Sequence, residues 1–294
     1  MGDITLNLLM LQIVTGIALG AVYVLFALGL SLIFGMLTVV NFAHGAFFMV
    51  GAYLGVWLFA QTGNFWVCLL LVPLGVGGIG LLVERFLVRP LYGRGIDYPL
   101  LLTFGLSIMF VEIVRMTFGL DGIPFSTPRG LTGAVDIGLG LFPLYRLFLI
   151  GAAAVVVAFL YVFIEKTSFG LIIRAGARDP EIVRVLGIDV SKVWLVVFGI
   201  GTGIAGLSGM LSAPLQAVAP EMGVPLLADA FVVTVVGGMG SLKGAVIAGV
   251  LVGVVVSLTS LVSPEAGRVS IFVLMAVVLL VRPQGLFGRA GLMS

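Results

Sequence analysis

The chain has 294 residues, of which 61% are hydrophobic and only 10% are charged, and its mean hydropathy is +1.29. An ordinary soluble domain carries about a quarter charged residues, so this composition excludes a water-soluble globular protein. With one cysteine, Cys68, and one histidine, His44, the chain can build neither an intrachain disulfide nor a Cys/His metal cluster. We expect membrane lipid around it, and neither a bound metal nor a nucleic acid.

Apolar runs long enough to cross a membrane recur along the whole chain. A bilayer core about 30 Å thick needs about 20 mostly apolar residues per helix, and the runs do not alternate in polarity as the strands of a membrane barrel do. We therefore predict an all-α integral membrane protein, a polytopic bundle of about 8–9 transmembrane helices in a single domain over residues 1–294. The predicted spans are 8–36, 43–61, 65–83, 98–119, 144–164, 193–213, 226–239, 244–262 and 268–282.

The first run is longer than a bilayer core requires. Its 29 residues, at about 1.5 Å each, fit only if the helix is tilted or interrupted, and Gly29 and Gly35 are the candidate break points. No Lys or Arg precedes the run, and no small-residue cleavage site follows a short core. We therefore expect no cleaved signal peptide.

Glycine is abundant, with 42 residues, and it lies inside the predicted spans. In lipid, small residues let helix backbones approach closely, so spacings of four between glycines predict helix contacts. These spacings occur at Gly16/Gly20, Gly51/Gly55, Gly199/Gly203 and Gly249/Gly253. The related stretches GAFFMVGAYLG at 45–55 and GAVIAGVLVG at 244–253 each open a helix after a turn and indicate a duplicated half-unit.

A few polar residues fall in or beside the spans. Asn41 and His44 lie in a turn, where they cap the following helix or line a pathway, and we favour the cap. Thr103 and Ser107 lie one turn apart. Their hydroxyl groups either line a polar route or form hydrogen bonds with the backbone of their own helix. Asp229 precedes a short run, so we expect it to cap that helix; the alternative is a helix start that attracts a substrate carboxylate.

Two further features have simple structural interpretations. Glu112 and Arg115 stand three apart on one predicted helix, which favours an intrahelical ion pair over contact with a substrate. The stretch GGMGSLKG at 237–244 is similar in sequence to a phosphate-binding loop, but it has Leu242 where that loop needs a glycine before the lysine. We predict a tight turn between two helices there.

Basic residues indicate the orientation, because Lys and Arg accumulate in loops left on the cytoplasmic side. The segments 85–94 and 165–192, together with a C-terminal set, hold 11 of the 15 basic residues, and we assign them to the cytoplasm. The C-terminal set consists of Lys243, Arg282 and Arg289. Nine crossings then leave the N-terminus and the loop 120–143 outside.

The cytoplasmic segment 165–192 carries its own helix signals. Asp179 is a good N-cap, Pro180 suits the first helical position, Glu181 favours the positive end of the helix, and Gly187 closes it in a left-handed conformation. We predict a short helix over 180–186. Such a helix is too short to be stable alone, so it should dock on a partner through exposed apolar residues. We expect Ile182, Val183 and Leu186 to be those residues.

At this point the chain resembles the permeases of ATP-binding-cassette importers for branched-chain amino acids, essentially over its full length. The resemblance rests on GLSLIFGMLTVVNFAHGAFFMVGAYLG at 29–55, RAGARDPEIVRVLGID at 174–189 and FVVTVVGGMGSLKGAVIAG at 231–249. It implies half of a translocation pathway in the cytoplasmic (inner) membrane of a bacterium or archaeon. It also implies that 174–189 form the short cytoplasmic coupling helix, which sits in a cleft of an ATPase. The residues implied in coupling are Arg174, Asp179, Pro180, Glu181, Ile182, Leu186 and Gly187.

The resemblance further implies partners rather than chemistry in this chain. They are a second, related permease, two cytoplasmic ATPase subunits that bind ATP and magnesium, and a periplasmic or lipid-anchored substrate-binding protein. The loop 120–143 is the one sizeable external segment and therefore the best candidate for receiving the binding protein. We expect no cofactor on this chain and no enzymatic activity of its own.

Two other kinds of transport protein share some of these features. An ion-coupled secondary transporter also has Gly-rich spans and repeats, but intramembrane acids are scarce and the capped cytoplasmic helix has no role in it. A passive channel also needs few charges, and the same helix argues against it. Related permeases serve urea and short amides, so a cargo of branched-chain amino acids rests on the resemblance alone.

Overall fold

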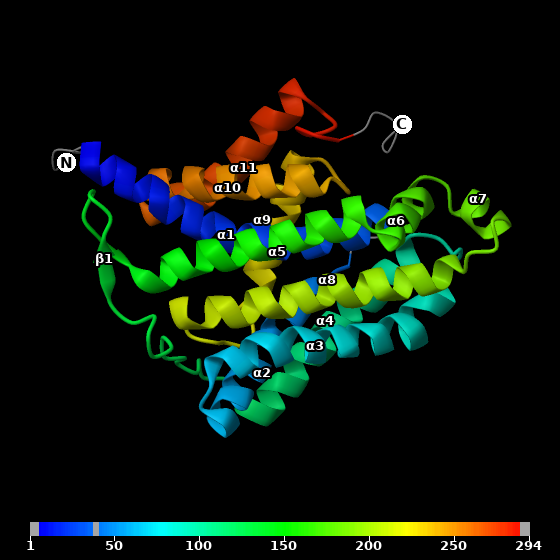
Figure 1. Ribbon diagram of the computed structural model, residues 1–294, viewed down its shortest axis with the longest axis horizontal. Helices are drawn as coiled ribbons and strands as arrows, with labels where there is room; N and C mark the ends of the chain where they lie inside the picture. Colours follow the sequence, from blue (N-terminus) through cyan, green and yellow to red (C-terminus); the bar gives the residue numbers. More distant parts are fainter. Residues whose placement is uncertain (1–5, 38–40, 289–294) are drawn as a thin grey trace. The chain divides into compact units, whose positions relative to one another are not determined.

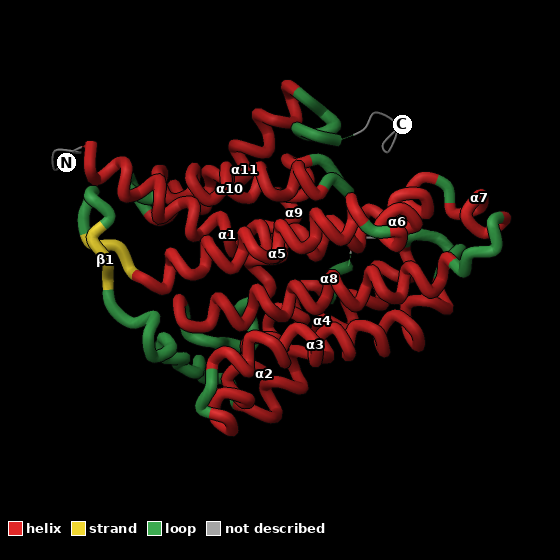
Figure 2. Tube along the Cα trace, viewed as in Figure 1, coloured by secondary structure: helices red, strands yellow, loops and turns green. Residues whose placement is uncertain are grey.

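A computed structural model describes residues 6–37 and 41–288 of the chain. Within them nearly all regular structure is helical, and Figure 2 shows one short hairpin among the helices. The elements are α1 Leu6–Leu37, α2 His44–Thr62, α3 Phe65–Val83, a π-helical turn η1 Glu84–Val88, a 3₁₀ turn η2 Arg89–Leu91, α4 Asp97–Phe118, β1 Ala134–Asp136, β2 Leu141–Pro143, α5 Leu144–Lys166, α6 Ser168–Arg178, α7 Pro180–Val185, α8 Val190–Ser212, a 3₁₀ turn η3 Ala213–Leu215, α9 Gly223–Gly237, α10 Leu242–Thr259 and α11 Pro264–Val281.

Eight of the described helices are long and apolar enough to cross a membrane, which confirms a polytopic all-α membrane protein. They are α1, α2, α3 with its continuation to Leu91, α4, α5, α8 with its continuation to Leu215, α10 and α11. The predicted span 226–239 corresponds to α9, which has only 15 residues. Arg289, one of the basic residues that we assign to the cytoplasmic side, lies outside the described residues.

Helix α1 runs without a break for 32 residues, so of the two alternatives for this long run the interruption at Gly29 or Gly35 is excluded and tilt remains. The absent side chain of Gly29 serves packing instead. A Cβ atom there would lie 2.5 Å from the Gly201 carbonyl oxygen and 3.0 Å from the His44 ring. The glycine therefore allows α1 to approach α2 and α8 closely, and the helical hydrogen bonds continue through it.

The chain forms two compact units. The first comprises Met1–Ala27, Ser126–Val157 and Asp229–Ser294, and the second comprises Leu28–Phe125 and Ala158–Ala228. In the first unit, α1 packs on α10 along the predicted glycine pairs. A Cβ atom on Gly20 would lie 2.9 Å from the Gly249 carbonyl oxygen, and one on Gly16 would lie 2.6 Å from the Val254 Cα.

The tight turn predicted between two helices is present in the first unit, between α9 and α10. Gly238 and Gly240 have positive φ angles of 100° and 77°, and Ser241 caps α10 by accepting from the Gly244 N–H at 3.1 Å. The chain after α11 crosses this turn, since the Leu286 N–H donates to the Val236 carbonyl at 2.8 Å. The turn is thus part of the packed structure.

In the second unit, α2, α3 and α8 lie side by side (Figure 1) and touch through backbone. A Cβ atom on Gly51 of α2 would collide with the Gly206 backbone of α8, and one on Gly203 would lie 2.8 Å from the Pro73 carbonyl oxygen of α3. These contacts confirm the small-residue spacings predicted for α2 and α8. They make the three helices a closely packed block.

Several long helices keep much of their apolar surface uncovered within the chain. Leu101, Phe104 and Met116 on α4 are exposed, as are Val277 and Leu280 on α11. Exposing so large an apolar surface to water is energetically unfavourable, so these faces contact lipid or another subunit.

Candidate functional site

Helix α7 forms as the sequence predicts, one residue shorter at its end. The Asp179 carboxylate accepts from the N–H groups of Glu181 and Ile182, both at 3.0 Å, and Pro180 occupies the first turn. Gly187 follows in the left-handed region with φ 79°. The predicted capping chemistry therefore determines both ends of this helix.

The exposed apolar face of α7 differs from the expected one in one residue. Ile182 and Leu186 are 60% and 71% exposed, but Val183 is only 2% exposed and Val185 is 88% exposed. The helical period explains the difference, because residues 182, 185 and 186 share one face whereas 183 points inward. The apolar tip of α7, as we call Ile182, Val185 and Leu186, is well placed for a partner, since α7 lies beyond the ends of α3 and α8 (Figure 1).

A second helix in the segment 165–192, α6, was not predicted from the sequence. Thr167 caps it by accepting from the Gly170 N–H at 3.0 Å, and Gly170 packs against the Ile164 backbone at the end of α5. A Thr cap followed by apolar residues at helical spacing is the signal that was available. The segment 174–189 is therefore not one helix but the end of α6, the whole of α7 and a turn.

Arg174 has a different environment from the other predicted coupling residues. Its guanidinium donates to the Ile164 carbonyl and forms an ion pair with Glu165 at 3.0 Å. It therefore ties α6 back to α5, and it is not part of the exposed tip of α7.

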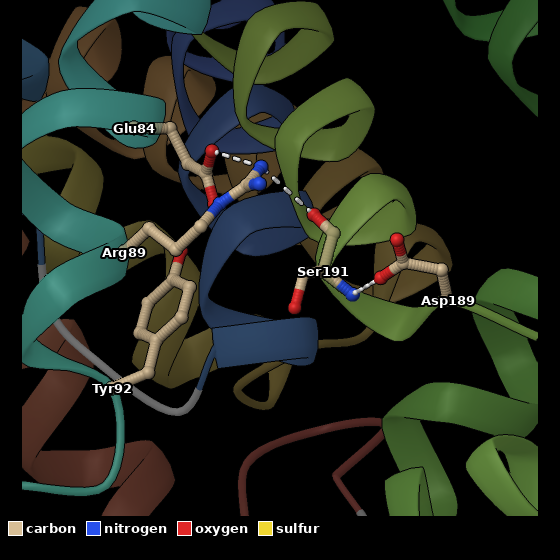
Figure 3. Close-up of polar contacts among 5 residues, drawn as sticks. All are labelled: Glu84, Arg89, Tyr92, Asp189 and Ser191. Carbon is tan, nitrogen blue, oxygen red and sulfur yellow. Dashed lines mark hydrogen bonds and ion pairs between the residues drawn. The ribbon is translucent and has the colours of Figure 1, made fainter.

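A buried ion pair lies where α3 ends, and sequence reasoning missed its acidic member (Figure 3). The Glu84 side chain is completely buried and accepts from Arg89 Nη2 at 2.8 Å, Arg89 Nε at 3.2 Å and the Tyr92 hydroxyl at 3.1 Å. Burial, and then the charge of Glu84, raise the pKa of the Tyr92 phenol, so the hydroxyl keeps the proton that it donates. A charge inside an otherwise apolar run was the available signal.

The same Arg89 reaches the start of α8. Its Nη2 donates to the Ser191 carbonyl at 3.1 Å, and Asp189 caps α8 by accepting from the Ser191 N–H at 3.1 Å (Figure 3). We call Glu84, Arg89, Tyr92 and the Ser191 carbonyl the Arg89 bridge.

Trp194 adds an aromatic contact beside the Arg89 bridge. Its ring meets the Tyr92 ring edge to face with centroids 4.8 Å apart, and the Arg184 guanidinium of α7 lies 5.8 Å above it. Trp194 of α8 is therefore in contact both with α7 and with the segment that follows α3.

The candidate pathway residues of the second unit gather around the turn before α2. Asn41 Oδ1 accepts from the Ala43 N–H at 3.1 Å, and Thr103 Oγ1 accepts from the Phe42 N–H at 3.2 Å. Asn41, His44 and Thr103 are all buried, while Ser107 is half-buried one turn further along α4. The Asn41 side chain caps the turn rather than α2 itself, which begins at His44.

Asp229 is not a helix cap, so that prediction is wrong. Helix α9 begins six residues earlier, at Gly223, because Pro225 falls in its first turn, where a missing N–H leaves no hydrogen bond unmade. Asp229 instead accepts from the Tyr23 hydroxyl at 3.2 Å.

The predicted ion pair between Glu112 and Arg115 is present, and Arg115 also contacts Glu221. Among the described residues no group of three or more His, Cys, Asp or Glu side chains is placed to hold a metal ion.

A family model described as the permease component of branched-chain amino acid transport systems matches residues 12–281. The high-affinity branched-chain amino acid transport system permease protein BraD of Pseudomonas aeruginosa is 30% identical over 95% of both chains, and LivH of Escherichia coli is 31% identical over 95% of both. LivM of Escherichia coli is 28% identical, covering 90% of this chain and 67% of LivM.

No solved structure matches the chain. The family model, the relatives and the eight spans agree with one another: the chain is a multi-pass membrane protein and belongs to the family of branched-chain amino acid transport permeases.

Proposed function

We propose that this chain is the transmembrane permease subunit of an ATP-binding-cassette importer and forms half of a translocation pathway for branched-chain or related small amino acids. Family membership supports the transport role, and the names of the relatives supply the substrate class. The chain acts in the cytoplasmic membrane of a bacterium or archaeon.

The apolar tip of α7 is the observation that carries the ATPase part of this proposal. Ile182 and Val185 stand exposed on a six-residue helix, as does Leu186 at its C-cap, and this helix is capped at both ends and lies outside the eight spans. A helix this short is not stable by itself, and such a tip in water favours a protein partner. A cleft in a cytoplasmic ATPase fits this helix-in-groove geometry.

The remaining partners follow from the same assembly. A second, related permease completes the pathway, two ATPases hold ATP and magnesium, and a periplasmic or lipid-anchored protein delivers the substrate. ATP closes the ATPases, their movement displaces α7, and the pathway between the permeases opens to the other side. The polar turn with Asn41, His44 and Thr103, together with Ser107 and Asp229, is our candidate for groups along the pathway.

Co-purification of tagged protein from its native membrane tests this proposal. We expect the unmodified chain to bring down an ATPase whose activity rises with substrate, and we expect Ile182→Asp and Leu186→Asp to release it. Leu141→Asp, at an equally exposed position on the external hairpin, is the matched control and should retain the ATPase. A chain that purifies alone and transports on an ion gradient would contradict the proposal.

A further inference from the structure

The Arg89 bridge joins two helices that are far apart in the sequence. One guanidinium nitrogen, Arg89 Nη2, donates both to the Glu84 carboxylate and to the Ser191 carbonyl. Glu84 directly follows α3, whereas Ser191 is the second residue of α8. A side chain that bonds both helix ends transmits a displacement of either one to the other.

The pairing of Glu84 with Arg89 depends on an irregular turn. In an ordinary α-helix, residues five apart point about 140° away from each other around the axis. Here the Arg89 N–H bonds to the Glu84 carbonyl in a π-helical turn, and this wider turn brings both side chains to one side. A regular helix would separate the two charges and leave the buried carboxylate without its guanidinium.

On its other side the bridge connects to α7 over a short path. The Ile188 N–H donates to the Val183 carbonyl of α7 at 3.3 Å, and the next residue, Asp189, caps α8. Arg184 on α7 lies over Trp194, which in turn contacts Tyr92. Helix α7 therefore connects to the bridge through backbone and through side chains.

Beyond the bridge, α3 and α8 have no room to slide past each other. A Cβ atom on Gly77 would lie 3.0 Å from the Gly199 carbonyl oxygen, and one on Gly80 would collide with the Thr202 side chain. A movement that enters at this end is passed along both helices together.

We propose that Glu84, Arg89 and Tyr92 are positioning residues that carry the displacement of α7 into α3, so that α7, α8 and α3 move as one lever. This inference rests on the proposed function, because the displacement originates in the ATPases. The buried charge supports this role, because breaking the pair would leave the fully buried Glu84 carboxylate uncompensated, and its three donated hydrogen bonds therefore hold Arg89 and Tyr92 in place.

The test is a reconstituted transporter with its partner permease, ATPases and binding protein, in which substrate transport and ATP hydrolysis are measured together. Arg89→Lys keeps the charge but removes the fork of Nε and Nη2 that holds both oxygens of Glu84, and Tyr92→Phe removes one donor. We expect both variants to assemble with the ATPases and hydrolyse ATP, while the substrate transported per ATP falls about tenfold, as expected for losing one charge-assisted hydrogen bond. Lys192→Gln, which removes a charge from the same turn of α8 in an exposed pair with Asp189, should leave this ratio unchanged.

Each outcome has a distinct meaning. An unchanged ratio in Arg89→Lys overturns the lever, and so does a loss of assembly that lowers transport and hydrolysis equally, because the bridge would then only hold the fold. If the unmodified chain binds no ATPase, the proposed function itself fails, and this is seen before any variant is compared.

Discussion

Tyr23 and Asp229 are 206 positions apart in the sequence and are joined by a hydrogen bond of 3.2 Å from the phenol to the carboxylate. The bond connects α1 with α9 inside the first unit. Acidic groups in membrane helices are costly unless they are paired, and they commonly face a partner or an aqueous route. The Tyr23 hydroxyl is thus a structural partner for a carboxylate that remains partly accessible.

Tyr23→Phe should lower the stability of the protein in detergent by about 1 kcal/mol, because the carboxylate loses this donor. Asp229→Asn keeps an acceptor for Tyr23 and should therefore unfold at nearly the original temperature. If Asp229 lies on the pathway, Asp229→Asn will lower transport while the bound ATPase is retained. Thermal unfolding and uptake, measured on the same preparations, separate these two effects. Normal uptake by Asp229→Asn would show that Asp229 is not a pathway residue.

Asp179→Ala should destabilise α7 by about 1 kcal/mol, because two backbone N–H groups lose their cap. Asp179→Asn keeps the capping oxygen and should restore most of the loss. Hydrogen exchange at residues 181–186 measures the effect directly. Asp136→Ala, which removes a similar bond to the Gly138 N–H in the hairpin, should leave that exchange unaltered.

Gly51→Ala should destabilise the second unit by about 1–3 kcal/mol, since the new methyl group would collide with the Gly206 backbone. Gly105→Ala is the matched change on α4, where a Cβ atom meets nothing within 4 Å. It should be neutral or stabilise the helix by up to about 1 kcal/mol. Equal unfolding temperatures for the two variants would contradict the packing described between α2 and α8.

Thr103→Val should cost about 1–3 kcal/mol, because the Phe42 N–H loses its acceptor inside the protein. Thr103→Ser should recover much of that loss. On the same helix, Thr117 is exposed and its hydroxyl bonds to its own helix, so Thr117→Val is the control and should change little. Thermal unfolding of the three variants tests whether the turn before α2 is fixed by this contact.

The features that the sequence predicts well are those decided by neighbouring residues. The apolar runs identify the long helices, and the order Asp179, Pro180 and Gly187 defines both ends of α7. Glycine spacing likewise anticipates which helix faces touch, because the absence of a side chain is visible in the sequence and its consequence in lipid is direct.

The features that the sequence does not reveal depend on distant partners. The role of Asp229 follows from Tyr23 on another helix, and its assignment as a cap failed because the helix could begin earlier, at Gly223. The Arg89 bridge needs both a π-helical turn and a carbonyl 102 positions away, neither of which leaves a periodic pattern. The sequence prediction omits helix α6, although its N-cap and the helical spacing of its apolar residues are both present in the sequence.

The unbroken α1 has a consequence for the lipid around the protein. Its 32 residues extend about 48 Å, whereas a typical hydrocarbon core is about 30 Å thick. The surplus is taken up by tilt, by turns that project into the headgroups, or by local thickening of the bilayer. Since most of α1 is buried within the protein, packing fixes its tilt, and the surrounding lipid and headgroups adjust to the length of this helix.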